Sequence, residues 1–448
     1  MALLYPRPTL QQLPRFPLTA AEVETLTSAA DFRQVLLQQI ARARQRIYLT
    51  ALYLQDDDAG HEVMEALLAA RRAHPELDVR VLVDWHRAQR GLIGAGKQAG
   101  NAAWYRASSD AHDGAIPVYG VPVQTRELFG VLHLKGFVFD DTVLYSGASL
   151  NEVYLQYQDK YRHDRYHLLH CRELADALVN FTRQYLLSSP AVHRLDQADC
   201  PPTRLLRREI RLLRRQLAMA RYDVSHASLE AQNGLAVTPL IGIGRNNPLN
   251  RHVLDLLSSA RERVIICTPY FNFPKPVTRE INRLIQRGVQ LEIIVGDKTA
   301  NDFFIPPHES FKAIGALPYL YEVNLRRFAK QHRKALLNGQ LKLHLWKDGT
   351  NSFHLKGIWV DDHYHLLTGN NLNPRAFSLD LENALLIHDP HGELQALKQQ
   401  ELDAIHRHTR TIQQHRELET LRQYPERVRK LLTRLSRVRI DRLIYRIL

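Results

Sequence analysis

The sequence predicts an α/β protein made of two pseudo-symmetric halves, each a sheet covered by helices, with a site between them. Two observations predict this fold. The stretch "HLKGFVFDD" (133–141) recurs as "HLKGIWVDD" (354–362), and the copies differ only at their fifth to seventh positions. A helical pattern followed by a buried-type strand also occurs twice, at 31–54 and at 248–271. Features that recur in the same order indicate internal duplication.

Each half then continues with a further helix and strand, and these strands cover 77–85 and 289–297. The strand–helix–strand order is typical of an α/β sheet with parallel members. We expect four segments: a first half over 1–187, a linker with a basic helix over 188–234, a second half over 235–424, and a basic amphipathic helix over 425–448.

The repeated motif reads as part of a strand that leads into a turn and a further strand. Side chains alternate along a strand, so His133 and Lys135 are expected on one face, and His354 and Lys356 likewise. The aspartates at the strand ends are expected to hold the turns rather than contact a substrate; they are Asp140 and Asp361.

Composition limits the class of partner. Hydrophobic residues make up 45% of the 448, which is typical of a folded globular protein. The net charge of +13 and the pI near 9.6 indicate an anionic partner: nucleic acid, an anionic membrane surface or a phosphorylated substrate. No apolar run reaches the length of a membrane span, and no secretory signal is visible. The few cysteines favour a reducing compartment.

The two His–Lys pairs together match what a phosphodiester reaction needs. One imidazole attacks phosphorus, and the other donates and later accepts a proton. The two ammonium groups neutralise the phosphoryl oxygens as charge develops. This chemistry needs no cofactor or metal, and the sequence contains no compact cluster of metal ligands.

Further polar residues follow each motif. Ser149 and Asn151 in the first half, and Asn371 and Asn373 in the second, have the i, i+2 spacing that lets a pair face one phosphate. Two carboxylates could each hold a histidine ring in one tautomer; they are Asp164 and Glu382.

Two loops after strand ends are candidate substrate contacts. The loop "VDWHRAQRG" carries Arg87 and Arg90, which could bind a pyrophosphate, and "GDKTANDF" carries Lys298 and Asn301. The alternative is a solvated loop. The nearby histidine-rich run is expected to have ordinary core or surface roles rather than to bind metal; it comprises His163, His167 and His170.

Both motifs fit the pattern HxKxxxxD, and the chain thereby resembles the phospholipase D superfamily. Further stretches, such as "VLYSGASLN" and "GNNLNPRAFSLDLENA", resemble members from Gram-negative bacteria that transfer a phosphatidyl group from CDP-diacylglycerol to L-serine. The resemblance implies release of CMP and a phosphatidyl-histidine intermediate. It implies His133 as the nucleophile, His354 as general acid and then general base, and both lysines as phosphate ligands. The Gly-Ser that often follows the motif in this superfamily is replaced by "GAS" and "GNN".

Basic amphipathic helices predict where the protein acts. The helices at 204–221 and 425–448 combine arginines with apolar stripes, which is typical of binding to an anionic membrane surface. We therefore expect a cytoplasmic protein attached peripherally to the inner membrane. The alternatives are that the tail helix packs against the body, and that the helix at 204–221 packs between the halves.

Other functions remain open from the residues alone. A cardiolipin synthase or a phospholipase D would use the same chemistry on another phospholipid. A metal-independent nuclease is a further alternative, but no aromatic stretch suited to stacking bases is visible, so no nucleic acid is expected. The sequence does not indicate an oligomeric state.

Overall fold

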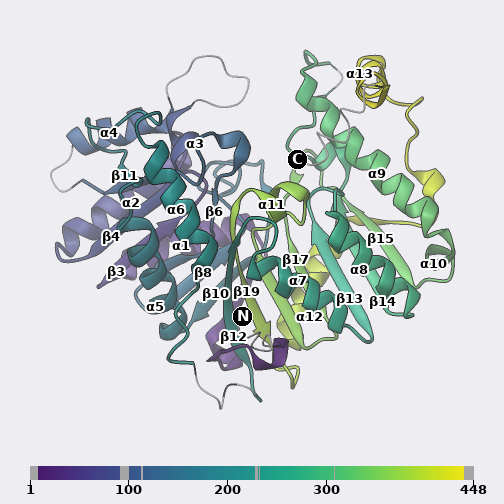
Figure 1. Cartoon of the computed structure of the whole chain (residues 1–448), viewed down its shortest axis with the longest axis horizontal. Coiled ribbons are helices and arrows are strands. Elements are labelled where there is room, and N and C mark those ends of the chain that lie inside the picture. The colour runs from purple at the N-terminus through teal and green to yellow at the C-terminus, as the bar shows by residue number, and fades with distance from the viewer. Residues whose placement is uncertain are drawn as a thin grey trace, which may run out of the picture.

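The computed structural model describes residues 9–90, 100–111, 115–227, 231, 233–306 and 308–437. Figure 1 shows two lobes side by side, each with a sheet flanked by helices. The predicted α/β class with two similar halves is confirmed. The last part of the expected tail helix, 438–448, lies outside the described residues.

The first lobe is built on an eight-stranded sheet with the order β11-β5-β4-β3-β7-β8-β10-β2. The three central strands β3, β4 and β5 are parallel, and the other pairings in this sheet are antiparallel. The strands are β2 (Val23–Leu26), β3 (Arg46–Thr50), β4 (Asp78–Asp84), β5 (Val118–Val121), β7 (Phe137–Phe139), β8 (Thr142–Ser146), β10 (Tyr166–His170) and β11 (His193–Arg194). The helices are α1 (Ala29–Arg42), α2 (Asp58–Ala73), α3 (Trp85–Gln89), α4 (Asn101–Ala111), α5 (Arg172–Phe181) and the π-helix η4 (Thr182–Leu187).

The second lobe is built on a sheet with the order β1-β12-β19-β18-β17-β13-β14-β15-β20, to which β6 adds on β19. Its strands are β1 (Phe16–Pro17), β12 (Ala236–Ile243), β13 (Arg263–Thr268), β14 (Gln290–Gly296), β15 (Leu341–Trp346), β17 (Gly357–Val360), β18 (Tyr364–Thr368), β19 (Leu381–His388) and β20 (Thr409–Ile412). Its helices include α7 (Pro248–Ser259), α8 (Lys275–Gln286), α9 (Leu317–Gln331), α10 (Arg333–Leu337), α11 (Pro374–Ser378), α12 (Gln395–His406) and α13 (Glu426–Arg437).

The duplicated helix–strand units form in both lobes for the same local reasons. Ser28 begins α1 by accepting a hydrogen bond from the Asp31 N–H, and Asn247 begins α7 by accepting one from the Asn250 N–H. Each helix then buries an apolar face at helical spacing, as Phe32, Leu36 and Ile40 do in α1. The strands that follow, β3 and β13, pair in parallel with β4 and β14.

Two short strands cross from one lobe to the other. β6 (Leu132–His133) pairs in parallel with β19 of the second lobe. β16 (Ser352–Phe353) pairs in parallel with β9 (Arg162–His163) of the first. β6 ends at His133, β16 ends at Phe353 directly before His354, and the chain returns to its own sheet as β7 or β17. The expectation that each His and Lys share one continuous strand is therefore wrong, because residues 134–136 and 354–356 lie between two strands.

Glycines allow the chain to change sheets within each motif. Gly136 has a φ of 108°, a conformation that other residues rarely adopt. A glycine is needed at 357 for a different reason, because a Cβ there would lie 2.2 Å from an Arg165 guanidinium nitrogen. Only glycine leaves room for that arginine.

Two basic helices cover their apolar faces inside the protein. In α6 (Arg207–Met219), Ile210, Leu213 and Leu217 are buried, and the helix contacts η4 of the first lobe and β12 of the second. The alternative that this helix packs between the halves is thus the one observed. In α13, Val428 and Leu432 are buried in a cluster with Ala316, Tyr319 and Tyr424. Of the described helices, none has the length and apolar character that crossing a membrane requires.

The aspartate that ends each motif binds backbone rather than facing the neighbouring histidine. Asp140 and Asp361 lie in turns with φ near 50°, and each carboxylate accepts hydrogen bonds from three consecutive backbone N–H groups at 2.6–2.9 Å. The donors are Arg44, Gln45 and Arg46 for Asp140, and Arg261, Glu262 and Arg263 for Asp361. Each aspartate thus joins its turn to the start of the neighbouring strand.

We predict that Asp361→Ala lowers the free energy of unfolding by about 2 kcal/mol, because three N–H groups lose their acceptor. Asp361→Asn should cost less, since it keeps one acceptor oxygen and tolerates a positive φ. Urea unfolding followed by circular dichroism measures both. Equal midpoints for the wild type and the alanine variant would contradict this structural role.

Candidate active site

The histidine of each motif is held by a carboxylate from the other lobe. His133 Nδ1 lies 2.9 Å from Glu382 Oε2, and His354 Nδ1 lies 2.8 Å from Asp164 Oδ2. All four side chains are buried, and His133 and His354 keep only 8% and 6% of their surface exposed. A carboxylate on Nδ1 fixes the ring and leaves Nε2 for chemistry.

The crossing strands set these contacts. In the pairing of β6 with β19, His133 stands directly opposite Glu382. After β16 pairs with β9, the His354 N–H donates to the His163 carbonyl at 2.8 Å, which puts His354 beside Asp164. The two motifs therefore depend on each other's lobe for their geometry.

The two lysines lie in the same buried region. Lys356 is fully buried, and its Nζ donates to Asp164 Oδ2 at 3.2 Å and also contacts the His354 ring. Lys135 Nζ donates to the Ala148 carbonyl at 3.1 Å. Lys135 also runs close along the second lobe, because a Cβ on Gly369 would lie 2.7 Å from its Cγ.

Asn383 fixes the backbone of Lys135 from the second lobe. Its Oδ1 accepts the Lys135 N–H at 2.8 Å, and its Nδ2 donates to the Lys135 carbonyl at 2.8 Å. Nδ2 also donates to the Tyr222 hydroxyl at 3.1 Å. Lys135 lies between two strands and has no strand partner there. The Asn383 side chain satisfies both of its backbone groups instead.

The clustered cations perturb the titration of the site. Burial and the charges of Lys135 and Lys356 lower the pKa of His133 well below its usual value. Burial and Lys356 lower the pKa of His354 to about 4, against the opposing effect of Asp164. Burial and Lys356 lower the pKa of Lys135 to about 7. An anionic ligand among these groups would relieve the mutual repulsion of the cations.

A carboxylate in the same cluster stays ionised. Burial alone would raise the pKa of Asp164, but the Lys356 ammonium and the hydrogen bond with His354 outweigh it and bring the pKa to about 2. An ionised Asp164 can stabilise a positive charge on either neighbour.

Sequence reasoning missed a polar network beside His354. The Tyr154 hydroxyl lies 3.0 Å from His354 Nδ1, and the Arg162 guanidinium lies over the Tyr154 ring at 4.6 Å. Arg162 in turn forms an ion pair with Asp302 of the second lobe at 2.9 Å, and the Tyr270 hydroxyl donates to Asp302 at 3.1 Å. Asp302 belongs to "GDKTANDF", the loop already singled out, but no spacing marked it.

The four expected phosphate donors have mixed positions. Asn151 Oδ1 accepts the Tyr154 N–H, and Asn373 caps α11 by accepting the Ala376 N–H. Ser149 is buried, and the Asn371 carbonyl accepts from the Thr268 hydroxyl. Asn151 and Asn373 therefore accept local backbone N–H groups. Contact of any of the four residues with a phosphate stays a prediction.

The loop residues expected to bind substrate make contacts within the protein. Arg87 lies over the Tyr53 ring at 5.0 Å, and Arg90 forms an ion pair with Glu127. Lys298 forms ion pairs with Glu322 at 3.1 Å and Glu419 at 3.0 Å, and Asn301 accepts the Phe303 N–H at 2.9 Å. A substrate would have to share these residues with their present partners.

The histidine-rich run of the first lobe makes core and surface contacts. His163 stacks on Trp346 with ring centroids 5.4 Å apart, and His167 lies 3.2 Å from Glu401. His170 lies 3.2 Å from Glu24 at the surface.

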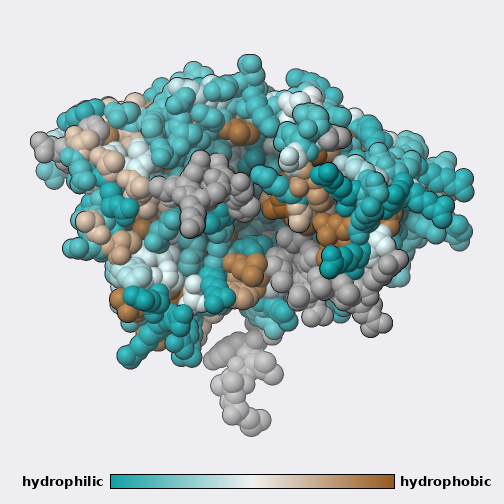
Figure 2. Space-filling model, turned by 90° about the horizontal axis from the view of Figure 1, so that it is seen from above, coloured by the Kyte–Doolittle hydropathy of each residue, from teal (hydrophilic) through white to brown (hydrophobic). Residues whose placement is uncertain are grey.

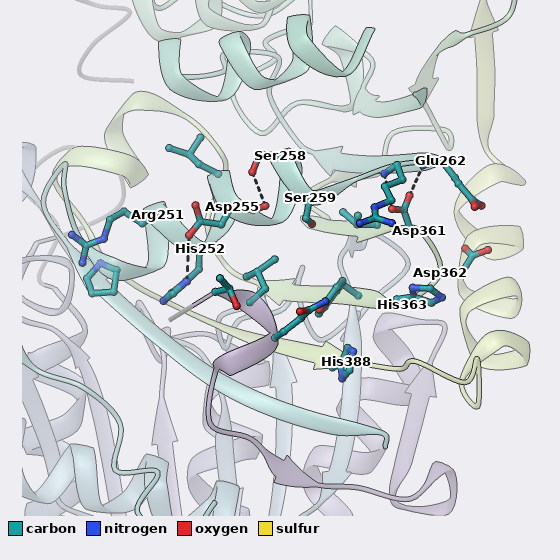
Figure 3. Close-up of a pocket in the computed structure, with 18 of the residues that line it drawn as sticks. Arg251, His252, Asp255, Ser258, Ser259, Glu262, Asp361, Asp362, His363 and His388 are labelled. Atoms are coloured by element: carbon teal, nitrogen blue, oxygen red, sulfur yellow. Dashed lines mark hydrogen bonds and ion pairs between the residues drawn. The ribbon is translucent and has the colours of Figure 1, made fainter. Parts of the chain in front are cut away.

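A cavity of about 1130 Å³ opens elsewhere on the second lobe (Figure 3). Arg251, His252 and Asp255 of α7 line it, together with the turn at 361–363 and His388. Neither motif histidine nor motif lysine lines this cavity, so size alone does not identify the reaction centre.

Comparisons with known proteins find relatives that match nearly the whole chain. A family model described as "Cardiolipin synthase, PLD-like domain" matches residues 253–406. The chain is 52% identical to the CDP-diacylglycerol–serine O-phosphatidyltransferase PssA of Escherichia coli, over 98% of this chain and 97% of that protein. It is 49% identical to the CDP-diacylglycerol–serine O-phosphatidyltransferase of Haemophilus influenzae, over 98% and 97%. The crystal structure of phosphatidylserine synthase from H. influenzae matches with a TM-score of 0.95 over 98% of both chains, at 49% identity.

The fold and the paired motifs define an enzyme of the phospholipase D superfamily. Within that superfamily, the chain belongs to the CDP-diacylglycerol–serine O-phosphatidyltransferases.

We predict that Asp164→Asn and Glu382→Gln each lower phosphatidyl transfer by about 10²–10⁴-fold, because the amide no longer fixes the ring tautomer or stabilises its cation. In Asp164→Asn the pKa of His354 should fall further, since Asp164 is a group that raises it. Turnover measured across pH, with circular dichroism to check folding, tests both effects. Unchanged turnover in either variant would exclude a positioning role for that carboxylate.

Proposed function

We propose that the chain transfers the phosphatidyl group of CDP-diacylglycerol to the hydroxyl of L-serine, which yields phosphatidylserine and CMP. The substrates are those in the names of its full-length bacterial relatives. One structural observation supports the chemistry: each histidine is held by the other lobe's carboxylate, and the charges of Lys356 and His354 act on His133. Two imidazoles and two ammonium groups suit transfer of a phosphoryl-centred group.

In the first step, His133 Nε2 attacks the phosphorus that carries the diacylglycerol. The bond from this phosphorus to the bridging oxygen breaks, and the electron pair leaves with CMP. Burial and the neighbouring ammonium groups keep the pKa of His133 low, so the ring is neutral and nucleophilic. The bound pyrophosphate raises the pKa of His354, which favours the protonated ring that gives CMP its proton.

In the second step, serine replaces CMP. His354, now neutral, takes the proton of the serine hydroxyl as the oxygen attacks phosphorus and the bond to His133 breaks. Lys135 and Lys356 bind the non-bridging oxygens in both steps. Water can take the place of serine, so slow formation of phosphatidic acid is expected.

A second candidate is transfer to another alcohol, as in a cardiolipin synthase or a phospholipase D. The description of the matching family model favours it, but that match covers only residues 253–406. The serine transferases match nearly the whole chain.

One assay separates these candidates. The protein is incubated in mixed micelles with CDP-diacylglycerol, with and without L-serine, and in parallel with phosphatidylglycerol. A chelator is present throughout, and CMP and lipid products are followed. Serine-dependent phosphatidylserine supports the proposal. Turnover only with phosphatidylglycerol would favour the second candidate.

We predict that His133→Ala lowers turnover by about 10⁴-fold or more and forms no covalent lipid. His354→Ala should instead release a burst of CMP and accumulate lipid-labelled protein, because CMP leaves as a stable anion while serine lacks its base. Rapid quench with CDP-diacylglycerol labelled in the phosphatidyl phosphate measures both.

The matched control is His170→Gln, a histidine of the first lobe that lies 3.2 Å from Glu24 at the surface and takes no part in the proposed steps. A burst in His133→Ala and none in His354→Ala would reverse the two assignments. A burst in neither variant, with folded protein, would contradict the covalent intermediate.

We also propose that the protein binds anionic lipid peripherally through exposed basic faces. The apolar side of α13 is covered within the protein, which leaves Arg427, Arg429, Lys430 and Arg434 exposed. Figure 2 shows the molecule from above, the side on which α13 lies in Figure 1, and most of that face is hydrophilic. Such binding is mainly electrostatic rather than insertion of an apolar stripe.

We predict that replacing Arg427, Arg429 and Arg434 together by Gln weakens binding to anionic vesicles about 100-fold, at roughly 1 kcal/mol per basic residue. The control replaces three exposed basic residues on other elements: Arg42, Arg172 and Lys342. Vesicle co-sedimentation across salt concentrations measures both. An equal loss of vesicle binding in the two variants would show that binding depends on the overall net charge rather than on α13.

A further inference from the structure

We propose that the second lobe contains a binding site for a divalent transition-metal ion, zinc foremost, formed by Glu292, His344 and His406. The residues come from β14, β15 and α12 and are far apart in the sequence, so no compact motif marks them. None of them takes part in the proposed transfer reaction. The sequence predicted no metal for catalysis, and this site is a separate one.

The three ligand atoms already lie close together. One atom from each residue falls within 4.8 Å of the others. Glu292 Oε1 lies 2.5 Å from His406 Nε2 and 3.4 Å from His344 Nε2. Ligands at 2.0–2.2 Å from a tetrahedral zinc are roughly 3.3 Å apart, so small side-chain movements suffice to bind an ion.

One ligand atom has no other hydrogen-bonding role. His344 is 8% exposed, and its Nε2 is buried without a hydrogen-bond partner although it faces the Glu292 carboxylate. Its other nitrogen, Nδ1, lies 3.1 Å from the Thr411 hydroxyl, which fixes the ring. A ligating histidine typically has its second nitrogen held in this way. A cation between Nε2 and the carboxylate would satisfy both groups.

The carboxylate is also supported. The Arg263 guanidinium donates to Glu292 Oε2 at 2.9 Å and leaves Oε1 toward the two histidines. Glu292 Oε1 is thus placed to bind a cation between the two histidine rings.

The remaining coordination position can be filled by water. The His406 side chain is 32% exposed, so the cluster opens to solvent on that side. Two imidazoles, one carboxylate and a water make a donor set that zinc accepts. An ion here would join α12 to two strands of the sheet. α12 also carries Glu401, which binds Arg165 at 2.7 Å beside Asp164. The expected role is therefore to stabilise this side of the lobe.

The test uses the full-length chain without a histidine tag. The protein is stripped with a chelator, dialysed and titrated with Zn²⁺ or Co²⁺. Metal per chain is measured after gel filtration, and the visible absorption of Co²⁺ reports coordination geometry. The variants are His406→Ala and His344→Gln, and the control is His363→Ala, an exposed turn histidine of the same lobe. Circular dichroism checks that each chain is folded.

The wild type and His363→Ala should bind one tight equivalent, with a Co²⁺ spectrum of low coordination number and a higher melting temperature when loaded. The ligand variants should bind about 100-fold more weakly and lose that increase. If His344→Gln fails to fold, His406→Ala alone tests the site. His406 is partly exposed, so this variant is expected to fold. Absence of tight binding in the wild type, or equal binding in all folded chains, would overturn the proposal. Transfer activity is assayed in the presence of chelator. A failure of the metal-site proposal can therefore be told apart from a failure of the proposed transfer reaction.

Discussion

The site depends on two parallel strand pairings that cross between the lobes, β6 on β19 and β16 on β9. Each pairing joins only two residues to two, yet it brings a carboxylate within 3 Å of a histidine from the opposite lobe. Burying an imidazole or an ammonium group is costly unless a partner is present. The crossing strands bring those partners to both motifs, so the position of each histidine is a property of the whole fold.

The crowding of cations explains why the region suits phosphates. Burial lowers the pKa values of Lys135, Lys356 and the two histidines, and the charge of a neighbouring lysine lowers those of Lys135 and both histidines further. A substrate with two linked phosphates brings negative charge to the same place and relieves that repulsion. Binding energy thus comes from groups that the free protein holds in an unfavourable state.

The sequence predicted the duplicated fold because its signals are local: the repeated motif, hydrophobic periodicity and the turn at Asp140. It also singled out Asp164 and Glu382, since their positions after the motifs correspond. It did not predict that each carboxylate serves the other lobe's histidine, because strand exchange leaves no trace in periodicity. Arg162, Asp302 and Asn383 were missed for a related reason: their roles arise from tertiary contacts, and a single polar residue gives no spacing pattern.

Strand exchange between two similar lobes is also how two identical chains would share one site. In a symmetric dimer, the two histidines would necessarily face carboxylates of the same residue type. Within a single chain that constraint disappears, and here one histidine faces a glutamate and the other an aspartate. A lysine and a tyrosine contact the ring of the second. Joining the copies covalently thus permits division of labour between groups that began as equivalents.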